Sequence, residues 1–305
     1  PSPRYGQSAE SAERALVALD DSVFAPGADI EETIARAAER LKGETAALAA
    51  IDIALHDLLG KRSGTPLHAA LGLDPRRACV TSYTIGIDTP EVIEEKIREA
   101  EDFPVLKIKM GLENDREIME TVRRLTGRPV RVDANEGWTR DEALEKIQWL
   151  ARLGVELVEQ PLPAANLDDE RWLAERSPLP LFADESVGGA SDIPKLAGAF
   201  HGINIKLMKC GGIREALAMI AAARERGMKI MLGCMIESSV GITAAAQISP
   251  LADYADLDGN LLIRNDPAAG VTAERGKLVL PKGPGLGVTL WEGPVASALR
   301  RPRAS

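Results

Sequence analysis

The sequence has few aromatic residues, no long apolar run and no excess of basic residues. Aromatic side chains make up 4% of its 305 residues, which disfavours the base-stacking platforms that bind single-stranded nucleic acid. A formal net charge of −9 leaves no basic footprint for a phosphate backbone. The longest apolar run, Ala216–Ala223, is far shorter than the roughly 20 residues that a membrane helix needs. We therefore expect neither a nucleic acid nor a membrane as a partner.

Histidine and cysteine are also scarce. Because the chain has only three histidines, a metal site would have to rely on oxygen ligands. The three cysteines (Cys79, Cys210 and Cys234) are odd in number and far apart, which indicates reduced thiols in a cytoplasmic protein and no disulfide framework. The chain begins at Pro1 without a methionine or a signal-like segment, so we expect its natural start to lie upstream.

The remaining composition, 45% apolar and 27% charged, is typical of a globular protein. Over the first 75 residues, apolar side chains recur at three- and four-residue spacing, which indicates helices. Three helices are predicted, over Ala9–Asp20, Asp29–Leu41 and Glu44–Leu59. Gly60 is predicted to end the third helix.

After Cys79 short β-rich runs alternate with amphipathic helices, which predicts right-handed crossovers and a parallel sheet. Eight strands at about 25-residue spacing favour a closed barrel. An open doubly wound sheet is the alternative, but no Gly-rich phosphate loop follows any strand. The predicted strands are Val80–Ile85, Val105–Met110, Val130–Ala134, Val155–Glu159, Leu181–Asp184, Gly202–Lys206, Lys229–Leu232 and Tyr254–Leu257. The helices between them include Pro90–Ala100, Arg140–Leu153, Gly212–Arg226 and Ser239–Ile248.

The alternation stops near Ala268, which divides the chain into three parts. Residues 1–77 form the helical N-terminal part, residues 78–267 the barrel, and residues 268–305 a C-terminal segment. That segment contains a short strand at Gly276–Leu280, and we expect it to pack back on the N-terminal helices.

Charged residues recur where the predicted strands end. From Lys109 the successive intervals are 24, 26, 25 and 22 residues, which lead to Asp133, Glu159, Asp184 and Lys206. Each interval is about the length of one strand–helix unit. Because all strands of such a barrel end at the same face, where active sites are built, these side chains are predicted to converge.

Three of the converging residues are carboxylates, Asp133, Glu159 and Asp184. Clustered carboxylates repel one another unless a cation lies between them. Mg²⁺ suits oxygen ligands and keeps coordination positions for water and substrate. The alternative is that each carboxylate is an ordinary solvated strand-end residue, which is harder to maintain for three in register.

The lysines complete the pattern. Alternation along a strand places Lys107 and Lys109 on one face, while Lys206 lies across the mouth with the carboxylates between. A nearby ammonium group and a metal ion both disfavour protonation, so a lysine here can act as a base. The alternative is a pair of lysines that extend to solvent from the rim; for Lys206, the neighbouring Lys209 is equally charged.

At these residues the sequence resembles the enolase superfamily, in its muconate-lactonizing subgroup. The matching motifs are Lys107-Ile-Lys109, Asp133-Ala-Asn135, Val158-Glu159-Gln160-Pro161, Ala183-Asp184-Glu185-Ser186 and Ile205-Lys206 followed by Gly211-Gly212. The segment Ile51–Gly60 is similar to the last helix of that family's cap. The resemblance covers nearly the whole chain.

The resemblance implies a (β/α)7β barrel with an α+β capping domain built from both chain ends. It implies that Asp133, Glu159 and Asp184 bind Mg²⁺ and that Lys109 and Lys206 are the acid/base pair. Lys107 would polarise the substrate carboxylate and depress the pKa of Lys109. Such sites remove a proton next to a carboxylate and stabilise the resulting enediolate with the metal.

The last strand favours one activity within the subgroup, the epimerisation of dipeptides. Asp256 and Asp258 are two residues apart and so share a face. Dipeptide epimerases carry such an Asp-x-Asp pair for the substrate's ammonium group, and it would repel a dicarboxylate. The alternative is that one aspartate faces the site and the other caps a turn. By the same resemblance Cys234 and Ile236 line the path of the dipeptide, and Ser82 contacts the substrate carboxylate.

The expected reaction is a 1,1-proton transfer at the α-carbon of the C-terminal residue of a dipeptide, with L-Ala-D/L-Glu from peptidoglycan as one candidate. The alternatives are an N-acylamino acid racemase, an o-succinylbenzoate synthase or a muconate cycloisomerase with the same enediolate chemistry, and a non-catalytic metal-binding barrel. The family's specificity loop would precede Pro1, so the sequence does not identify the dipeptide. Assembly as a homo-oligomer is an expectation from the resemblance alone.

Overall fold

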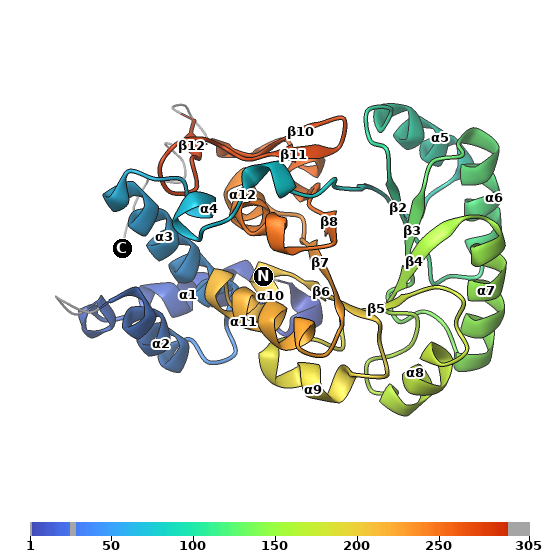
Figure 1. Cartoon of the computed structure of the whole chain (residues 1–305), viewed down its shortest axis with the longest axis horizontal. Helices are drawn as coiled ribbons and strands as arrows, with labels where there is room; N and C mark the ends of the chain where they lie inside the picture. Colours follow the sequence, from blue (N-terminus) through green and yellow to red (C-terminus); the bar gives the residue numbers. More distant parts are fainter. Residues whose placement is uncertain (1, 25–28, 292–305) are drawn as a thin grey trace.

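Eight parallel strands form a barrel in the order of the sequence (Figure 1). The computed structural model describes residues 2–24 and 29–291. The strands are β1 (Tyr83–Ile85), β2 (Leu106–Lys109), β3 (Val130–Asp133), β4 (Val155–Glu159), β5 (Leu181–Ala183), β6 (Gly202–Ile205), β7 (Lys229–Gly233) and β8 (Tyr254–Asp256). The barrel closes just before β1, where a parallel bridge joins Thr81 to Ala255 and the Ser82 amide donates to the Ala255 carbonyl. The closed barrel is therefore confirmed over the open sheet.

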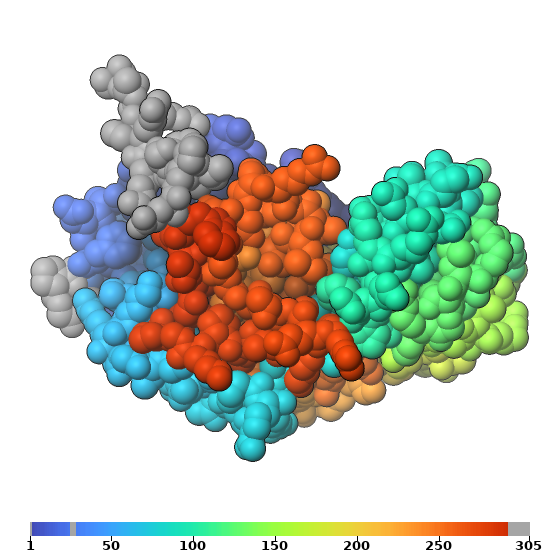
Figure 2. Space-filling model, turned by 90° about the horizontal axis from the view of Figure 1, so that it is seen from above, coloured from blue at the N-terminus to red at the C-terminus, as the bar shows by residue number. Residues whose placement is uncertain are grey.

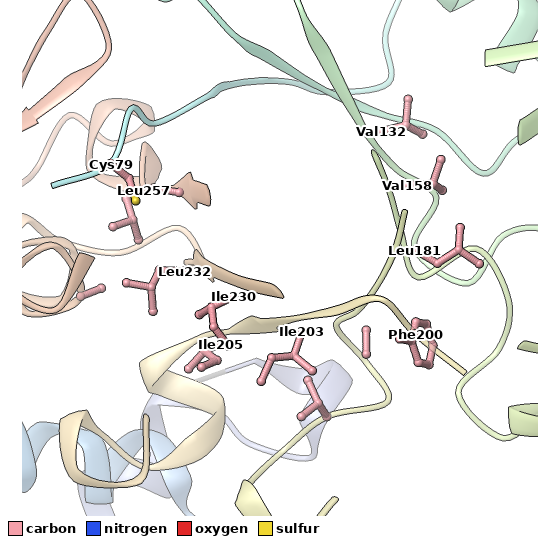
Figure 3. Close-up of a cluster of buried hydrophobic side chains, with 14 of the residues drawn as sticks. Cys79, Val132, Val158, Leu181, Phe200, Ile203, Ile205, Ile230, Leu232 and Leu257 are labelled. Atoms are coloured by element: carbon pink, nitrogen blue, oxygen red, sulfur yellow. The ribbon is translucent and has the colours of Figure 1, made fainter. Parts of the chain in front are cut away.

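Side-chain alternation along the strands sorts residues between two surfaces of the barrel. Val132, Val158 and Leu181 point outward toward the surrounding helices and join the main apolar core (Figure 3). The inward-facing Leu157, Phe182 and Met231 form a separate buried cluster at the floor. The barrel is thus filled below, and polar side chains occupy the inner positions toward the ends of the strands.

Helices alternate with the strands around the barrel. They are α5 (Pro90–Glu99), α6 (Asp115–Leu125), α7 (Arg140–Arg152), α8 (Leu167–Ala174), α9 (Ile193–Leu196), α10 (Leu207–Cys210), α11 (Ile213–Arg224) and α12 (Ser239–Gln247). Figure 1 shows α5 to α8 on one side of the barrel and the N-terminal helices on the opposite side. Over the residues described here, no helix is both long and apolar enough to cross a membrane.

The cap combines segments from the N-terminal and the C-terminal parts of the chain. Its helices are α1 (Ala9–Val17), α2 (Ile30–Arg40), α3 (Thr45–Ser63) and α4 (Leu67–Ala70), and its strands are β9 (Ala268–Ala269), β10 (Thr272–Glu274), β11 (Lys277–Val279) and β12 (Thr289–Leu290). The Leu67 amide donates to the Gly285 carbonyl, and the Leu286 amide donates to Asp57. The C-terminal strands accordingly lie against the N-terminal helices (Figure 2). Residues 292–305 of the predicted C-terminal segment lie outside the described residues.

The prediction for Gly60 was wrong. Helix α3 continues to Ser63, and Gly64, with a left-handed φ of 69°, caps it. A Cβ atom on Gly60 would lie 2.5 Å from the Cα of Gly285. The glycine is therefore needed for the close approach of the C-terminal segment, which the local sequence does not reveal.

Candidate active site at the carboxyl ends of the strands

A cavity of about 340 Å³ opens at the carboxyl ends of the barrel strands. Nearly every residue that the sequence predicted for chemistry or recognition lies on its wall or directly beneath it. The predicted residues on the wall are Lys107, Lys109, Asp184, Lys206, Cys234, Ile236, Asp256 and Asp258. Asp133 and Glu159 are fully buried beneath these side chains and contact Lys107.

The three predicted metal ligands come together. One carboxylate oxygen from each of Asp133, Glu159 and Asp184 lies within 4.8 Å of the others. Oε2 of Glu159 is buried and accepts no hydrogen bond, although the Lys107 ammonium lies 2.8 Å away as an ion pair. Burial, followed by the charge of Asp133, raises the pKa of Glu159 to about 7. An oxygen-only donor set of three converged, buried carboxylates fits a hard divalent cation such as Mg²⁺.

Lys107 lies at the centre of this group, with its Nζ atom 3.0 Å from Asp133, 2.8 Å from Glu159 and 2.6 Å from Asp256. Its burial alone would lower the pKa of the ammonium, but the three carboxylates outweigh that effect and raise the pKa well above its ordinary value. Lys107 is therefore a fixed positive charge that links the metal-binding carboxylates to the aspartates of the last strand.

Lys109 and Lys206 approach the triad from different strands. The Lys109 ammonium lies 2.7 Å from Oδ2 of Asp133 and is half-buried, whereas the Lys206 ammonium is buried 2.7 Å from Oδ2 of Asp184. Since β2 and β6 lie on opposite sides of the barrel (Figure 1), the two ammonium groups flank the triad as the sequence predicted. Lys209, which the sequence left as an alternative to Lys206, also pairs with Asp184, from helix α10.

Asp256, the last residue of β8, and Asp258, two residues later, form the second acidic group. The Thr84 amide donates to Oδ2 of Asp258 at 2.6 Å, and its hydroxyl lies 3.3 Å from Oδ1 of both Asp256 and Asp258. Both carboxylates face the cavity, which disfavours the alternative in which one only caps a turn. Burial and then the charge of Asp256 raise the pKa of Asp258 to about 6. Two buried carboxylates, of which Asp256 pairs with Lys107, can accept another cationic group.

Ser82, which was expected to contact the substrate carboxylate, does not line the cavity. Its side chain is fully buried, and its hydroxyl donates to Oδ1 of Asp256 at 2.8 Å. It therefore lies behind the cavity wall, where it orients Asp256, and Thr84 occupies the wall two residues later. Cys234 and Ile236 do line the cavity, on a loop that the Glu237 carboxylate fixes by accepting the Met235 amide at 2.8 Å.

Several site residues were not predicted. Asn204 donates to Glu159 at 2.6 Å, and Gln160 accepts the amides of Asp184 and Ser186. Arg4, near the N-terminus, pairs with Glu136 and lies 3.1 Å from Glu185 across the mouth. The sequence signal for Gln160 was its place in the Val158-Glu159-Gln160-Pro161 motif. In the structure it adopts a left-handed φ of 36°, which non-glycine residues rarely take outside functional or tight turns.

Comparison with known proteins agrees with this site. The family described as enolase C-terminal domain-like matches residues 91–293, and the mandelate racemase/muconate lactonizing enzyme N-terminal domain matches residues 4–72. An L-Ala-D/L-Glu epimerase of Bacteroides thetaiotaomicron is 46% identical over 288 residues, which cover 94% of this chain and 75% of that protein. A hydrophobic dipeptide epimerase of Roseobacter litoralis is 44% identical over 253 residues, with coverage of 80% and 73%.

A solved structure is also similar, that of a dipeptide epimerase from Cytophaga hutchinsonii complexed with Mg and the dipeptide D-Ala-L-Val. The TM-score is 0.88 at 28% identity, over 97% of this chain and 85% of that chain. The predicted barrel fold and the resemblance to the dipeptide epimerases are thus confirmed. The chain belongs to the enolase superfamily, in the group of mandelate racemase and muconate lactonizing enzyme.

Proposed function

We propose that the protein is a Mg²⁺-dependent dipeptide epimerase that inverts the α-carbon of the C-terminal residue by 1,1-proton transfer. One observation carries this proposal. A buried carboxylate triad lies between Lys109 and Lys206, and a second acidic pair lies at the other end of the same cavity. Similar proteins with the same family assignment are epimerases of dipeptides.

The acidic pair orients the substrate. Asp256 and Asp258 receive the ammonium group of the N-terminal residue, because a cation is the complement of two buried carboxylates. The substrate carboxylate then lies toward the triad of Asp133, Glu159 and Asp184. This orientation places the second α-carbon between the two lysines.

Proton transfer then requires the two lysines in opposite protonation states. A neutral amine of one lysine takes the α-proton, which leaves its electron pair in the enediolate, and the ammonium of the other lysine returns a proton to the opposite face. Lys109 and Lys206 suit these roles because they reach the triad from β2 and β6. The reverse reaction exchanges their roles, so each lysine serves one enantiomer.

Three carboxylates supply the metal-binding oxygens for Mg²⁺, which as a Lewis acid stabilises negative charge on the substrate carboxylate. Lys107 contacts two of these ligands and Asp256. It keeps the two acidic groups from repelling each other before substrate arrives, and it adds positive charge beside the substrate carboxylate.

The direct test is exchange of the substrate α-hydrogen in D₂O. Incubation with Mg²⁺ and a dipeptide library should add one mass unit to dipeptides that the enzyme epimerises, and the label should sit on the C-terminal α-carbon. Candidates include L-Ala-D/L-Glu, the dipeptide of peptidoglycan. Absence of exchange with every dipeptide, together with turnover of an N-acyl amino acid or a muconate, would contradict the proposal.

Two further expectations stay predictions. The three cysteines are free thiols, which agrees with the cytoplasmic location expected from the sequence. Assembly into a homo-oligomer rests on the family resemblance, and measurement of the mass in solution tests it.

A further inference from the structure

A second chamber opens from the catalytic cavity beside Lys109. It has a volume of about 380 Å³ and lies between β1, helix α5 and the turn that follows β8. Four residues line both the chamber and the catalytic cavity, and these are Thr84, Lys109, Ile236 and Leu262. The two spaces are therefore neighbours that meet at these four side chains, and we expect the chamber to hold part of a molecule whose remainder lies at the triad.

The chamber is mostly apolar. Ile85 and Ile93 are buried in its wall, while Ile236 and Leu262, at its junction with the catalytic cavity, are 70% and 41% exposed. The charged groups in its wall have partners: Lys96 pairs with Glu99 and Lys109 with Asp133, each at 2.7 Å, and Asp88 accepts the Thr89 amide at 2.8 Å. Exposed aliphatic side chains at the entrance of a binding site favour an apolar ligand group, because its arrival removes apolar surface from water on both sides.

The position of Thr84 connects the chamber to the proposed ammonium site. Its amide and hydroxyl hold Asp258, and the same residue lines the chamber. In a dipeptide the N-terminal α-carbon is bonded directly to the ammonium nitrogen. A side chain on that carbon therefore starts next to Thr84 and can enter the chamber.

The side chain of the epimerised residue does not fit the same space. In a planar enediolate the side chain lies in the plane of the α-carbon, and the two lysines lie on opposite faces of that plane. Of the two lysines, Lys109 lines the chamber and Lys206 does not. The chamber thus extends along the Lys109 side of that plane, where the C-terminal side chain does not point.

We infer that this chamber is the subsite for the side chain of the dipeptide's N-terminal residue, and that the enzyme favours a branched aliphatic residue there over alanine. The inference rests on the proposed dipeptide epimerase activity and adds its substrate class. Transfer of one methylene group from water to an apolar site strengthens binding about fourfold. Substrates of the form L-Leu-L-Xaa should therefore have a KM at least tenfold below that of L-Ala-L-Xaa.

The test compares L-Ala-L-Ala with L-Leu-L-Ala by α-hydrogen exchange, in the wild-type enzyme with Mg²⁺ and in variants of Val92. Val92 is half-buried in the chamber wall and does not line the catalytic cavity. Val92→Phe should lower kcat/KM for L-Leu-L-Ala about tenfold, through KM, and change L-Ala-L-Ala less than twofold. Val92→Ala, which enlarges the chamber, should shift the preference toward L-Phe-L-Ala.

Leu261→Phe is the matched control, since Leu261 is 50% exposed beside Leu262 but lines neither space. It should leave the ratio of the two substrates unchanged. Equal effects of Val92→Phe on both substrates, or no wild-type preference for L-Leu-L-Ala, would overturn the subsite while exchange itself continued. Loss of exchange with all dipeptides in the wild-type enzyme would overturn the proposed function instead.

Discussion

The two ends of the catalytic cavity are both acidic, but they are held in different ways. At the metal end, lysines surround Asp133, Glu159 and Asp184. At the ammonium end, hydrogen bonds from Ser82 and Thr84 hold Asp256 and Asp258, and Lys107 pairs with Asp256. Hydroxyl and amide donors fix a carboxylate without cancelling its charge. On the proposed function, the first end serves proton transfer during the reaction, and the second end recognises a cation.

The largest expected effect comes from removing the lysines of the metal end. Lys109→Met and Lys206→Met should each lower kcat for epimerisation at least about 10³-fold, because general acid–base groups contribute about 10²- to 10⁴-fold and both are needed here. Each variant should still exchange the α-hydrogen of the one enantiomer that faces the remaining lysine. Exchange of each enantiomer in D₂O measures this, with Lys195→Met as a control at the distant helix α9. If a variant still exchanged the α-hydrogen of both enantiomers, the assignment of its lysine would be wrong.

A smaller effect is expected from one metal ligand. Glu159→Gln removes the charge of one of the three converged carboxylates, so the affinity for Mg²⁺ should fall on the order of 100-fold. In the wild-type protein Mg²⁺ at 100 times its Kd should add about 2.7 kcal/mol of stability, seen as a higher melting temperature. The variant should show no such increase at the same concentration, whereas Glu156→Gln, on the outer side of β4, should behave like the wild-type protein. An equal increase in Glu159→Gln would place the metal elsewhere.

The ammonium end should affect recognition more than chemistry. Asp258→Asn preserves the shape of the side chain but removes one of two negative charges, so KM for dipeptides should rise about 10- to 100-fold with a small change in kcat. N-acyl amino acids lack the ammonium group, and their kinetics should change less than about threefold. Steady-state rates for L-Ala-L-Glu and N-acetyl-L-Glu make the comparison. If both substrates lost activity equally, Asp258 would serve the structure of the site and not the ammonium.

Thr84→Val tests the support of the same end and should have a weaker effect. The valine keeps the amide that donates to Asp258 but removes the hydroxyl that lies 3.3 Å from both aspartates. One such hydrogen bond is worth about 1 kcal/mol, so KM for dipeptides should rise only about fivefold with kcat unchanged. Thr89→Val, at the N-terminus of α5, is the control. A fall in kcat larger than the rise in KM would show that Thr84 acts in the proton-transfer step and not only in binding.

The sequence predicted the barrel and most of the site because both follow local rules. Strand ends recur at the spacing of one strand–helix unit, so the intervals between Lys109, Asp133, Glu159, Asp184 and Lys206 indicated their convergence without any knowledge of contacts. The metal end is built almost entirely from such strand-end residues, and it was therefore predictable residue by residue.

Features that depend on contacts between distant segments were missed. Gly60 faces Gly285 across 225 positions of sequence, and Arg4 reaches Glu136 and Glu185 from the N-terminal turn. Ser82 was expected at the substrate carboxylate from the family resemblance alone, and it lies just before β1 with its hydroxyl on Asp256. The chamber beside Lys109 likewise joins β1, α5 and the turn after β8.

A buried carboxylate remote from both ends shows what burial does without a ligand cation. Glu170 of α8 is fully buried; one oxygen accepts the Leu162 amide at 3.1 Å and the other accepts no hydrogen bond. Burial raises the pKa of Glu170 from about 4.5 to about 8. Between these values the folded state holds a proton that the unfolded state has lost, so this residue lowers stability as the pH rises.

Glu170→Gln, which cannot ionise, should therefore gain stability relative to the wild-type protein between pH 5 and pH 8. The difference should grow by at most about 1.4 kcal/mol per pH unit, and urea unfolding at several pH values measures it. Glu175→Gln, exposed just after the same helix, should show no such trend. Added Mg²⁺ should leave the Glu170 trend unchanged, since this carboxylate lies apart from the triad. A pH-independent difference would mean that the pKa of Glu170 is not raised in the folded state and that its second oxygen has a donor.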